Sequence, residues 1–451
     1  MTTPHLAVVG AGITGLTAAY RLQQRGFGVT VLEGAERPGG KIWTGEIDGI
    51  TVEEGPDAFL PRDERVIDLC TELGLADDLV SPAVFGAYLW HRRALRRLPP
   101  GSPYGIPRAP KAAWQEGLLS AAGAARATLE RLWTKPLEGP DVSVGSFVRK
   151  RFGREVLDHL VDPLLAGVRG GRVEEMSLAT AAKEIDAIAR TRPSILRALR
   201  DHEPTPPVFL APRGGMQTIV DRLAAGAGDL RINTPVRALK RDGGRVTIEL
   251  DDGRVTVDGV VVALPTYRAA DVLHAIAPAA SPMLEDVGYA SVAVITLVYP
   301  PRSFVPPPKG SGFLVASRSG LTISACTWYS TKWPHVVTDG RIVLRCVVGR
   351  AGDDVPASDE ELVAATERDL ARVLGLKANP LATRVSRWER SIPEYRVGHL
   401  QLVDDIERSI ERAGPIVVAG AGYRGSGIPD CIASAERAVQ RLLERIRASD
   451  R

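Results

Sequence analysis

The sequence predicts an α/β fold: a Rossmann-like FAD-binding domain with a mixed-sheet substrate domain and a helical insert. The first observation is the order of signals at the N-terminus, with an apolar run at 5–9, a Gly-x-Gly-x-x-Gly turn at 10–15 and a helical pattern at 16–26. The second is a β-branched run at 29–32 that ends in Glu33. The third is another strand, glycine turn and helix near the C-terminus. Signals in this order are typical of dinucleotide-binding units.

The first glycine turn is expected to contact the pyrophosphate of a dinucleotide. Its glycines let the backbone turn tightly and approach a pyrophosphate, whose charge faces the N-terminus of the next helix. The acid that ends the second strand would accept a hydrogen bond from a ribose hydroxyl. A glycine turn without a ligand is the alternative, and five signals in register argue against it. The residues expected to contact the cofactor here are Gly10, Ala11, Gly12, Ile13, Thr14, Gly15, Glu33 and Gly34.

Two further turns favour a flavin dinucleotide over a nicotinamide one. Residues 36–41 (ERPGGK) place a second glycine pair and two cations beyond Glu33, where they would hold the other side of a longer dinucleotide's pyrophosphate. Residues 53–57 (EEGPD) form a turn whose glycine would let the backbone approach a flat ring. The residues expected to contact the cofactor in these turns are Arg37, Gly40, Lys41, Gly55, Pro56, Asp57 and Ala58.

The segments GAGITGLTAAYRL, VTVLEGAERPGGKI and EEGPDAF resemble the amine-oxidase superfamily of FAD enzymes. Within it, the chain looks most like the oxygen-dependent protoporphyrinogen/coproporphyrinogen oxidase family, and most like its Gram-positive-type, coproporphyrin-forming members. Residues 387–399 (RWERSIPEYRVGH) resemble the family's RW…PQY.VGH signature, with Glu394 where glutamine is usual. The resemblance covers nearly the whole chain.

This resemblance implies non-covalent FAD and a role in haem biosynthesis. The family removes hydrogens from a porphyrinogen in three two-electron steps, each passing a hydride to the flavin, and O2 reoxidises the flavin with release of H2O2. Because the flavin carries this chemistry, no side chain is expected to be a catalytic acid or base. The resemblance also implies cofactor contacts by Trp388 and by Val236, whose backbone amide would reach the adenine. Product hand-off to a ferrochelatase would follow.

Composition excludes several classes of function. A net charge of +3 gives no reason to expect nucleic-acid binding, and the seven histidines never cluster with cysteine or carboxylate at metal-ligand spacing. The four cysteines form no Cys-x-x-Cys pair, which indicates a reducing compartment without disulfides. We recognise no targeting peptide and no apolar run of about eighteen residues. The expectation is a cytoplasmic enzyme without a metal.

The length of 451 residues suits two or three domains. We expect the FAD-binding domain to take residues 1–62, 205–275 and 411–451. A mostly helical insert takes 63–204, and a substrate-binding domain takes 276–410. In the resembled family the insert is called the membrane-binding domain.

The insert is expected to contain a helix at 64–79 capped by Gly74, a hairpin at 87–98 and mostly helix from 114 to 200. Nine Lys or Arg and two acids occupy residues 91–135. This basic stretch is a solvated face, an interface for anionic lipid or a guide for an anionic substrate. Its apolar residues are mostly alanine rather than Phe or Trp, so we expect no membrane attachment.

The rest of the chain alternates between the two other domains. Between 276 and 410 strands dominate, interrupted by one helix at 359–374, which suggests a mixed sheet that roofs a ligand cavity. The second FAD-binding part is expected to contain a helix at 217–228, strands at 231–240, 245–250 and 254–257, and a buried strand at 260–264.

The C-terminal glycine loop is expected to face the flavin. Pro429 fits the first position of the terminal helix and Asp430 fits its first turn. A helix N-terminus aimed at the flavin would stabilise the negative charge that grows near N1 and O2 during reduction. An ordinary strand–turn–helix unit is the alternative. The residues expected to contact the cofactor here are Gly422, Tyr423, Ile428, Pro429 and Asp430.

The preferred substrate is expected to be coproporphyrinogen III, which carries four propionates, rather than protoporphyrinogen IX, which carries two. Residues 167–172 read GVRGGR where the family's cavity-lining stretch usually reads GVYAGD, and the added cations would suit propionates. Protoporphyrinogen oxidation, amine oxidation, desaturation of the phytoene type and a flavin-containing scaffold remain alternatives, although amine sites need aromatics and only 5% of residues are aromatic. The candidate substrate-binding residues are Gly167, Arg169, Arg172, Arg62 and Arg92.

Overall fold

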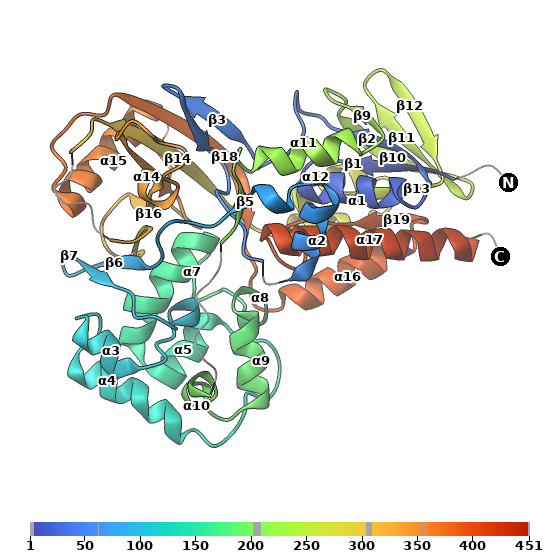
Figure 1. Cartoon of the computed structure of the whole chain (residues 1–451). Helices are drawn as coiled ribbons and strands as arrows, with labels where there is room; N and C mark the ends of the chain where they lie inside the picture. Colours follow the sequence, from blue (N-terminus) through green and yellow to red (C-terminus); the bar gives the residue numbers. More distant parts are fainter. Residues whose placement is uncertain are drawn as a thin grey trace.

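The computed structural model describes residues 4–61, 63–201, 209–303, 309–353, 355–356 and 358–449. Figure 1 shows three lobes: a parallel sheet with covering helices beside both chain ends, a second sheet at the opposite end, and a helical lobe below. The α/β fold with a mixed sheet and a helical insert is confirmed. The residue boundaries of the five-segment division stay a prediction.

A five-stranded parallel sheet forms the centre of the first lobe. Its strand order is β19-β13-β1-β2-β9, so segments from both ends and the middle of the chain lie side by side (Figure 1). Alternate residues of each strand pack into different cores, because both faces of the sheet are covered. The strands are β1 (His5–Val9), β2 (Gly28–Leu32), β9 (Asp229–Arg231), β13 (Gly259–Val262) and β19 (Ile416–Val418).

Helices cover one face of this sheet, and an antiparallel meander with further helices covers the other. The expected single strand at 231–240 is wrong. It is two strands in different sheets, because Asn233 adopts a left-handed conformation (φ 50°) and Pro235 interrupts the run. The first face carries α1 (Ile13–Gln23), α2 (Glu64–Glu72), α11 (Gln217–Ala225) and α17 (Ile428–Ser449). The second carries β10 (Val236–Asp242), β11 (Arg245–Leu250), β12 (Gly253–Val257), α12 (Thr266–Leu273), α13 (Ser281–Glu285) and α16 (His399–Glu411).

The second lobe is a seven-stranded mixed sheet in the order β18-β14-β17-β16-β15-β6-β7. The hairpin expected at 87–98 forms, and its first strand pairs in parallel with β15, so it extends this sheet. The single helix expected between 276 and 410 is wrong, because α13, α14 (Tyr329–Lys332) and α16 accompany α15 (Asp359–Leu374). The strands are β6 (Ala87–His91), β7 (Ala94–Arg97), β14 (Tyr289–Tyr299), β15 (Gly312–Val315), β16 (Ile323–Trp328), β17 (Ile342–Val348) and β18 (Ala382–Pro393).

The helical lobe has its own apolar core. Inside it the carboxylate of Glu130 accepts hydrogen bonds from Ser194 Oγ (2.8 Å) and from the backbone N–H groups that begin α10, and Arg151 lies 3.3 Å from it. The buried Glu130 is one of the two acids in the basic stretch. The helices are α3 (Pro110–Gln115), α4 (Ala121–Thr128), α5 (Val144–Phe152), α6 (Arg154–Val156), α7 (Asp162–Arg169), α8 (Leu178–Ala181), α9 (Lys183–Thr191) and α10 (Ile195–Arg200), with short turns η2 (Pro103–Gly105), η3 (Leu129–Leu132) and η4 (Leu157–Val161).

Short elements join the lobes. Gly74 takes a left-handed conformation (φ 71°) just beyond α2, so the expected glycine cap is confirmed. The expected extension of this helix to residue 79 is wrong, because η1 (Ala76–Asp78) follows. Two small sheets pair β3 (Thr44–Ile47) with β4 (Ile50–Glu53), and β5 (Leu79–Val80) with β8 (Ala211–Pro212).

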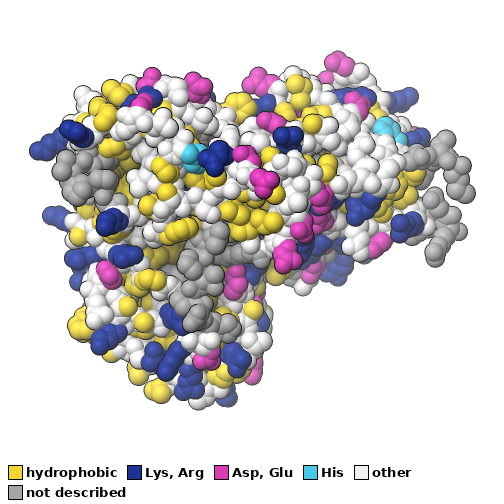
Figure 2. Space-filling view, in the orientation of Figure 1, with side chains coloured by type: hydrophobic (Ala, Val, Ile, Leu, Met, Phe, Trp, Pro, Cys, Tyr) yellow, Lys and Arg dark blue, Asp and Glu magenta, His cyan; other side chains and the backbone are white. Residues whose placement is uncertain are grey.

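The surface of the helical lobe mixes charge with apolar side chains. Figure 2 shows Lys and Arg scattered over this lobe with hydrophobic side chains between them. Trp114, Leu129 and Leu132 are among the exposed large hydrophobic residues. No helix in the described part of the chain combines the length and apolarity needed to cross a bilayer.

Candidate flavin site

The first glycine turn leaves a helix N-terminus open. Gly10 has a φ of 99°, and a Cβ on Gly15 would overlap the carbonyl oxygen of Gly10, so both positions require glycine. A Cβ on Gly12 would meet no described atom within 4 Å. No described side chain caps α1, which begins at Ile13 and has no acid in its first turn. The exposed N–H groups of this helix N-terminus suit an anion.

Glu33 stabilises this turn directly. Its Oε2 accepts a hydrogen bond from the backbone N–H of Ala11 (2.6 Å), and its Oε1 accepts one from Ala35 (2.9 Å). The sequence did not predict these contacts. Each carboxylate oxygen keeps a second lone pair, so the contact with a ribose hydroxyl stays a prediction.

The second glycine turn packs against the first. Gly39 donates from its backbone N to the carbonyl oxygen of Ala11 (2.8 Å). Arg37 donates to three carbonyls of its own turn, those of Pro38, Gly40 and Ile42, at 3.1–3.2 Å, and stacks over Trp43 at 3.8 Å. This cation therefore shapes the turn, and its contact with a pyrophosphate stays a prediction.

Lys41 reaches from the second turn to the seven-stranded sheet. Its Nζ donates to the carbonyl oxygen of Ser391, and burial lowers its pKa. Thr14 and Lys41 both interact with Cys431 in the first turn of α17, and burial raises the pKa of that thiol to about 11. The two glycine turns and the C-terminal helix therefore meet at one place.

The 53–57 turn lies between the second glycine turn and the seven-stranded sheet. A Cβ on Gly55 would overlap the carbonyl oxygen of Lys41, so this position requires glycine. Trp388 donates from Nε1 to the carbonyl oxygen of Glu54 (2.7 Å). Asp57 accepts from Lys332 Nζ (2.7 Å), so its side chain faces α14, the short helix that follows β16. Pro56 and Ala58 flank it in the same turn.

The C-terminal loop brings several polar groups together. A Cβ on Gly422 would lie 2.5 Å from both Thr266 Cγ2 and Tyr289 Oη. Thr266 Oγ1 and Tyr423 Oη are buried without a hydrogen-bond partner in the described part of the chain. Burial raises the pKa of Tyr423 well above its usual value. Unpaired buried groups at such a convergence are typical of a ligand site.

The terminal helix begins at Ile428, one residue before the expected position, so Pro429 is its second residue. The carboxylate of Asp430 accepts from Lys183 Nζ (3.0 Å) and from the backbone N–H of Gly427 (3.3 Å). Asp430 therefore ties the helical lobe to the glycine loop. Val236 begins β10 opposite Leu250 and is half-buried.

The open helix N-terminus, the paired glycine turns and the unpaired polar groups fit an FAD molecule. Four groups near the site were not predicted from the sequence: Thr266, Tyr289, Lys332 and Arg345. These four residues lie outside the glycine motifs, so no pattern in the sequence indicates them. Only the fold brings them to the candidate flavin site.

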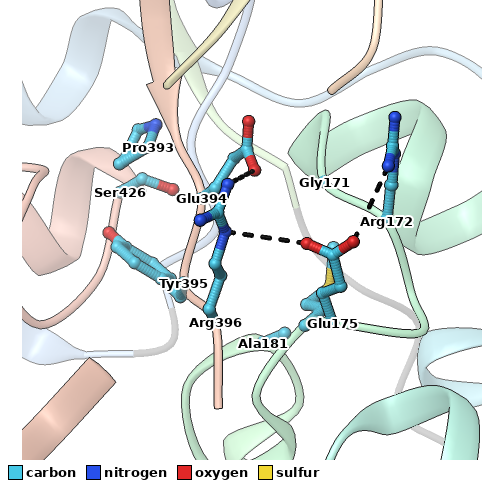
Figure 3. A pocket seen from close by; sticks show the side chains of 10 residues that line it. Gly171, Arg172, Glu175, Ala181, Pro393, Glu394, Tyr395, Arg396 and Ser426 are labelled. Carbon is cyan, nitrogen blue, oxygen red and sulfur yellow. Dashed lines mark hydrogen bonds and ion pairs between the residues drawn. The ribbon is translucent and has the colours of Figure 1, made fainter. Parts of the chain in front are cut away.

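Among the candidate substrate residues whose side chains are described, Arg172 and Arg92 do not line a common pocket. A small pocket lies between the loop after α7 and the end of β18, and Arg172 lines it (Figure 3). Arg172 pairs with Glu175 (3.7 Å), and Glu175 also pairs with Arg396 (3.6 Å), which pairs with Glu394 (3.4 Å). The charges of this pocket therefore balance.

The other candidates lie elsewhere or outside the described structure. Gly167 lies in α7 where a Cβ would be 3.3 Å from the carbonyl oxygen of Ser324. Arg169 ends α7, and its side chain is outside the described part. Arg92 is exposed in a left-handed conformation (φ 49°) at the β6–β7 turn and does not line the pocket. Arg62 lies outside the described residues.

Comparisons with known proteins agree with this geometry. The model of a family described as flavin containing amine oxidoreductase matches residues 13–443. The coproporphyrinogen III oxidase of Bacillus subtilis (strain 168) is 32% identical over 97% of this chain and 98% of its own. The coproporphyrinogen III oxidase of Mycobacterium bovis is 34% identical over 99% of both chains. A crystal structure from Exiguobacterium sp. 255-15, provisionally named a protoporphyrinogen oxidase, matches with a TM-score of 0.90 and 31% identity over 98% of this chain and 100% of that chain.

Proposed function

The chain belongs to the flavin-containing amine oxidoreductase family, and from this premise we propose that it uses FAD to oxidise coproporphyrinogen III to coproporphyrin III in haem biosynthesis. The observation that carries the proposal is the match to coproporphyrinogen III oxidases over nearly the full length of both chains. The family and the flavin expected from the sequence are confirmed. O2 as oxidant, H2O2 as product, hand-off to a ferrochelatase and a cytoplasmic location are part of the proposal.

FAD supplies the hydride acceptor that this dehydrogenation needs. We assign the pyrophosphate to the open N-terminus of α1 and the two glycine turns, supported by the space in front of Gly12. We assign the ribose to Glu33 and Gly34, and the adenine to Val236. We assign the flavin ring to the 53–57 turn, Trp388 and the loop before α17. The unpaired hydroxyls of Thr266 and Tyr423 support this assignment.

We assign propionate binding to Arg172, with Arg169, Arg62 and Arg92 as further candidates. Arg172 supports this because its guanidinium is half exposed and its ion pair with Glu175 is long at 3.7 Å. Because Glu175 already pairs with Arg172, a propionate would either share the guanidinium with Glu175 or replace it. The electrostatic preference for four carboxylates over two is therefore smaller than two unpaired arginines would give.

The assay is a side-by-side measurement of porphyrin fluorescence and peroxide release with coproporphyrinogen III and protoporphyrinogen IX under air. We expect faster porphyrin formation from coproporphyrinogen III, and faster turnover of protoporphyrinogen IX would contradict the proposal. The second candidate, protoporphyrinogen IX oxidase, is favoured by the provisional name of the similar crystal structure and by the balanced pocket. A panel of amines, with flavin bleaching as the readout, tests the amine-oxidase alternative.

A further inference from the structure

Arg345 of the seven-stranded sheet holds the 53–57 turn by hydrogen bonds to its backbone. It lies in β17 between β14 and β16, and only 7% of its surface is exposed. Its guanidinium donates from Nε to the carbonyl oxygen of Glu53 (2.8 Å) and from Nη2 to the carbonyl oxygen of Gly55. One planar side chain therefore bridges two carbonyls that lie two residues apart.

The carbonyl between these two is held by the same sheet. Trp388 of β18 donates from Nε1 to the carbonyl oxygen of Glu54 at 2.7 Å. The carbonyl oxygens of residues 53, 54 and 55 thus each accept a hydrogen bond from a side chain of the seven-stranded sheet. A buried turn needs partners for its backbone groups, and here tryptophan and arginine side chains supply them.

The far end of the turn is fixed by an ion pair. Asp57 accepts from Lys332 Nζ at 2.7 Å, and Trp333 Nε1 lies 3.5 Å from the same oxygen. Burial would raise the pKa of Asp57, but the charges of Lys332 and Arg345 outweigh it and lower the pKa to about 2. The carboxylate therefore stays ionised at neutral pH, and its side chain remains paired with Lys332 at the end of α14.

We propose that Arg345 is a positioning residue for the flavin that acts through the 53–57 turn, with Lys332 as the support at the Asp57 end. The inference rests on the proposed function only in taking this turn to face the flavin. On its other side the turn touches the second glycine turn, because Gly55 lies directly against the carbonyl oxygen of Lys41. A turn held between two layers transmits a shift of Arg345 to the backbone beside the cofactor.

Lysine is a poor substitute for Arg345. An ammonium group keeps the charge but does not present the planar fork that reaches two carbonyls at once. In Arg345→Lys one of the carbonyls of Glu53 and Gly55 loses its donor, and the turn is freed to move. The substitution removes the pair of hydrogen bonds to the turn but retains the positive charge that faces Asp57. A change in FAD affinity therefore reports the position of the turn rather than the loss of a charge.

The test compares Arg345→Lys with Arg350→Lys. Arg350 is also buried and donates to a carbonyl, that of Val315 (2.9 Å), and within the described residues it forms no hydrogen bond or ion pair with the turn. FAD affinity of the apoprotein is measured by fluorescence quenching, together with the thermal midpoint with and without FAD. We expect Arg345→Lys to weaken FAD binding about tenfold, the loss of one hydrogen bond to a charged donor, and Arg350→Lys to leave it within about twofold.

The increase in thermal midpoint on FAD binding distinguishes a loss of flavin positioning from a general loss of protein stability. Arg350→Lys should lower the thermal midpoints of the apoprotein and the holoprotein equally, whereas Arg345→Lys should also shrink the difference between them. Equal FAD affinity in the two variants, at matched loss of apoprotein stability, would overturn the inference. If Arg345→Lys does not fold, Lys332→Met, which removes the ion pair at the other end, must show the same selective loss of FAD affinity.

The proposed function and this inference fail in different ways. If the wild-type protein binds FAD but produces no porphyrin, the substrate assignment is wrong, and the comparison of FAD affinities still decides the role of Arg345. If the wild-type protein produces porphyrin and Arg345→Lys binds FAD normally, the inference is wrong and the function stands.

Discussion

Replacing Glu53 by glutamine should stabilise the protein at neutral and alkaline pH. Burial raises the pKa of this carboxyl to about 7, although the N–H of Met216, the hydroxyl of Thr44 and the charge of Arg345 each lower it. The unfolded chain loses this proton near the usual value of 4.5. Between these two values the folded state binds more protons than the unfolded one, so stability falls as pH rises from about 4.5 to about 7 and then levels off.

The size of the effect follows from the two pKa values. A carboxyl whose pKa rises from 4.5 to about 7 disfavours the folded state by about 3 kcal/mol once both states are ionised, at 1.36 kcal/mol for each factor of ten. Glutamine keeps an oxygen that can accept from Met216 N (2.7 Å), and it does not titrate. Glu53→Gln should therefore match the wild-type protein near pH 4.5 and exceed its stability by up to about 3 kcal/mol above pH 7.

The assay is denaturant unfolding of both apoproteins at several pH values between about 4.5 and 8, followed by circular dichroism. The readout is the difference in free energy of unfolding between the two proteins at each pH, so that titration of other groups cancels. Curves that stay parallel over this range would refute the reasoning, because they would mean that Glu53 titrates alike in the folded and unfolded chains.

Three further predictions concern the cofactor and the substrate. Glu33→Ala should weaken FAD retention by about 1.5–3 kcal/mol, because it removes a charged acceptor and frees Ala11 N; unchanged retention in a dialysis assay would place the ribose contact elsewhere. Acid precipitation should release the flavin into the supernatant, and colour that stays in the pellet would mean covalent attachment. Arg172→Gln should raise KM for coproporphyrinogen III about fivefold or more at unchanged FAD content, with a smaller change for protoporphyrinogen IX. Equal changes for both substrates would make Arg172 a structural residue.

The sequence allowed prediction of the features that neighbouring residues determine. Spacing within one short segment predicts the turn at 10–15, the acid at the end of the second strand and the helix at 359–374. In the structure α1 follows that turn, Glu33 lies beside it, and α15 spans Asp359–Leu374. The contacts of Arg345 and Lys332 could not be predicted in this way. Their partners lie nearly three hundred residues earlier in the chain, and only the tertiary placement of β17, which holds Arg345, and of α14, which holds Lys332, brings them beside the turn.

The same reasoning explains the errors in the boundaries. The hairpin at 87–98 was recognisable from its alternation, but its parallel pairing with β15 joins strands more than two hundred residues apart. Likewise, Gly74 was recognisable as a helix cap, but the apolar pattern that continues to residue 79 belongs to η1 and the start of β5 rather than to the helix. Periodicity reports which face is buried, whereas the ends of elements depend on single residues and on partners elsewhere in the chain.

The pocket between the loop after α7 and the end of β18 shows why a count of cations is not enough to predict substrate selectivity. Two arginines in the 167–172 stretch suggested a cationic wall, but Glu175 follows three residues after Arg172 and pairs with both Arg172 and Arg396. If a propionate displaces Glu175 from Arg172, it gains only the difference between its own pairing and the one that it displaces, together with the cost of leaving Glu175 in water or with Arg396 alone. On this hypothesis, discrimination between four and two carboxylates depends on how well Arg396 holds Glu175 after the exchange. Arg396→Gln should then raise KM for coproporphyrinogen III at unchanged FAD content, because it leaves Glu175 to compete for Arg172.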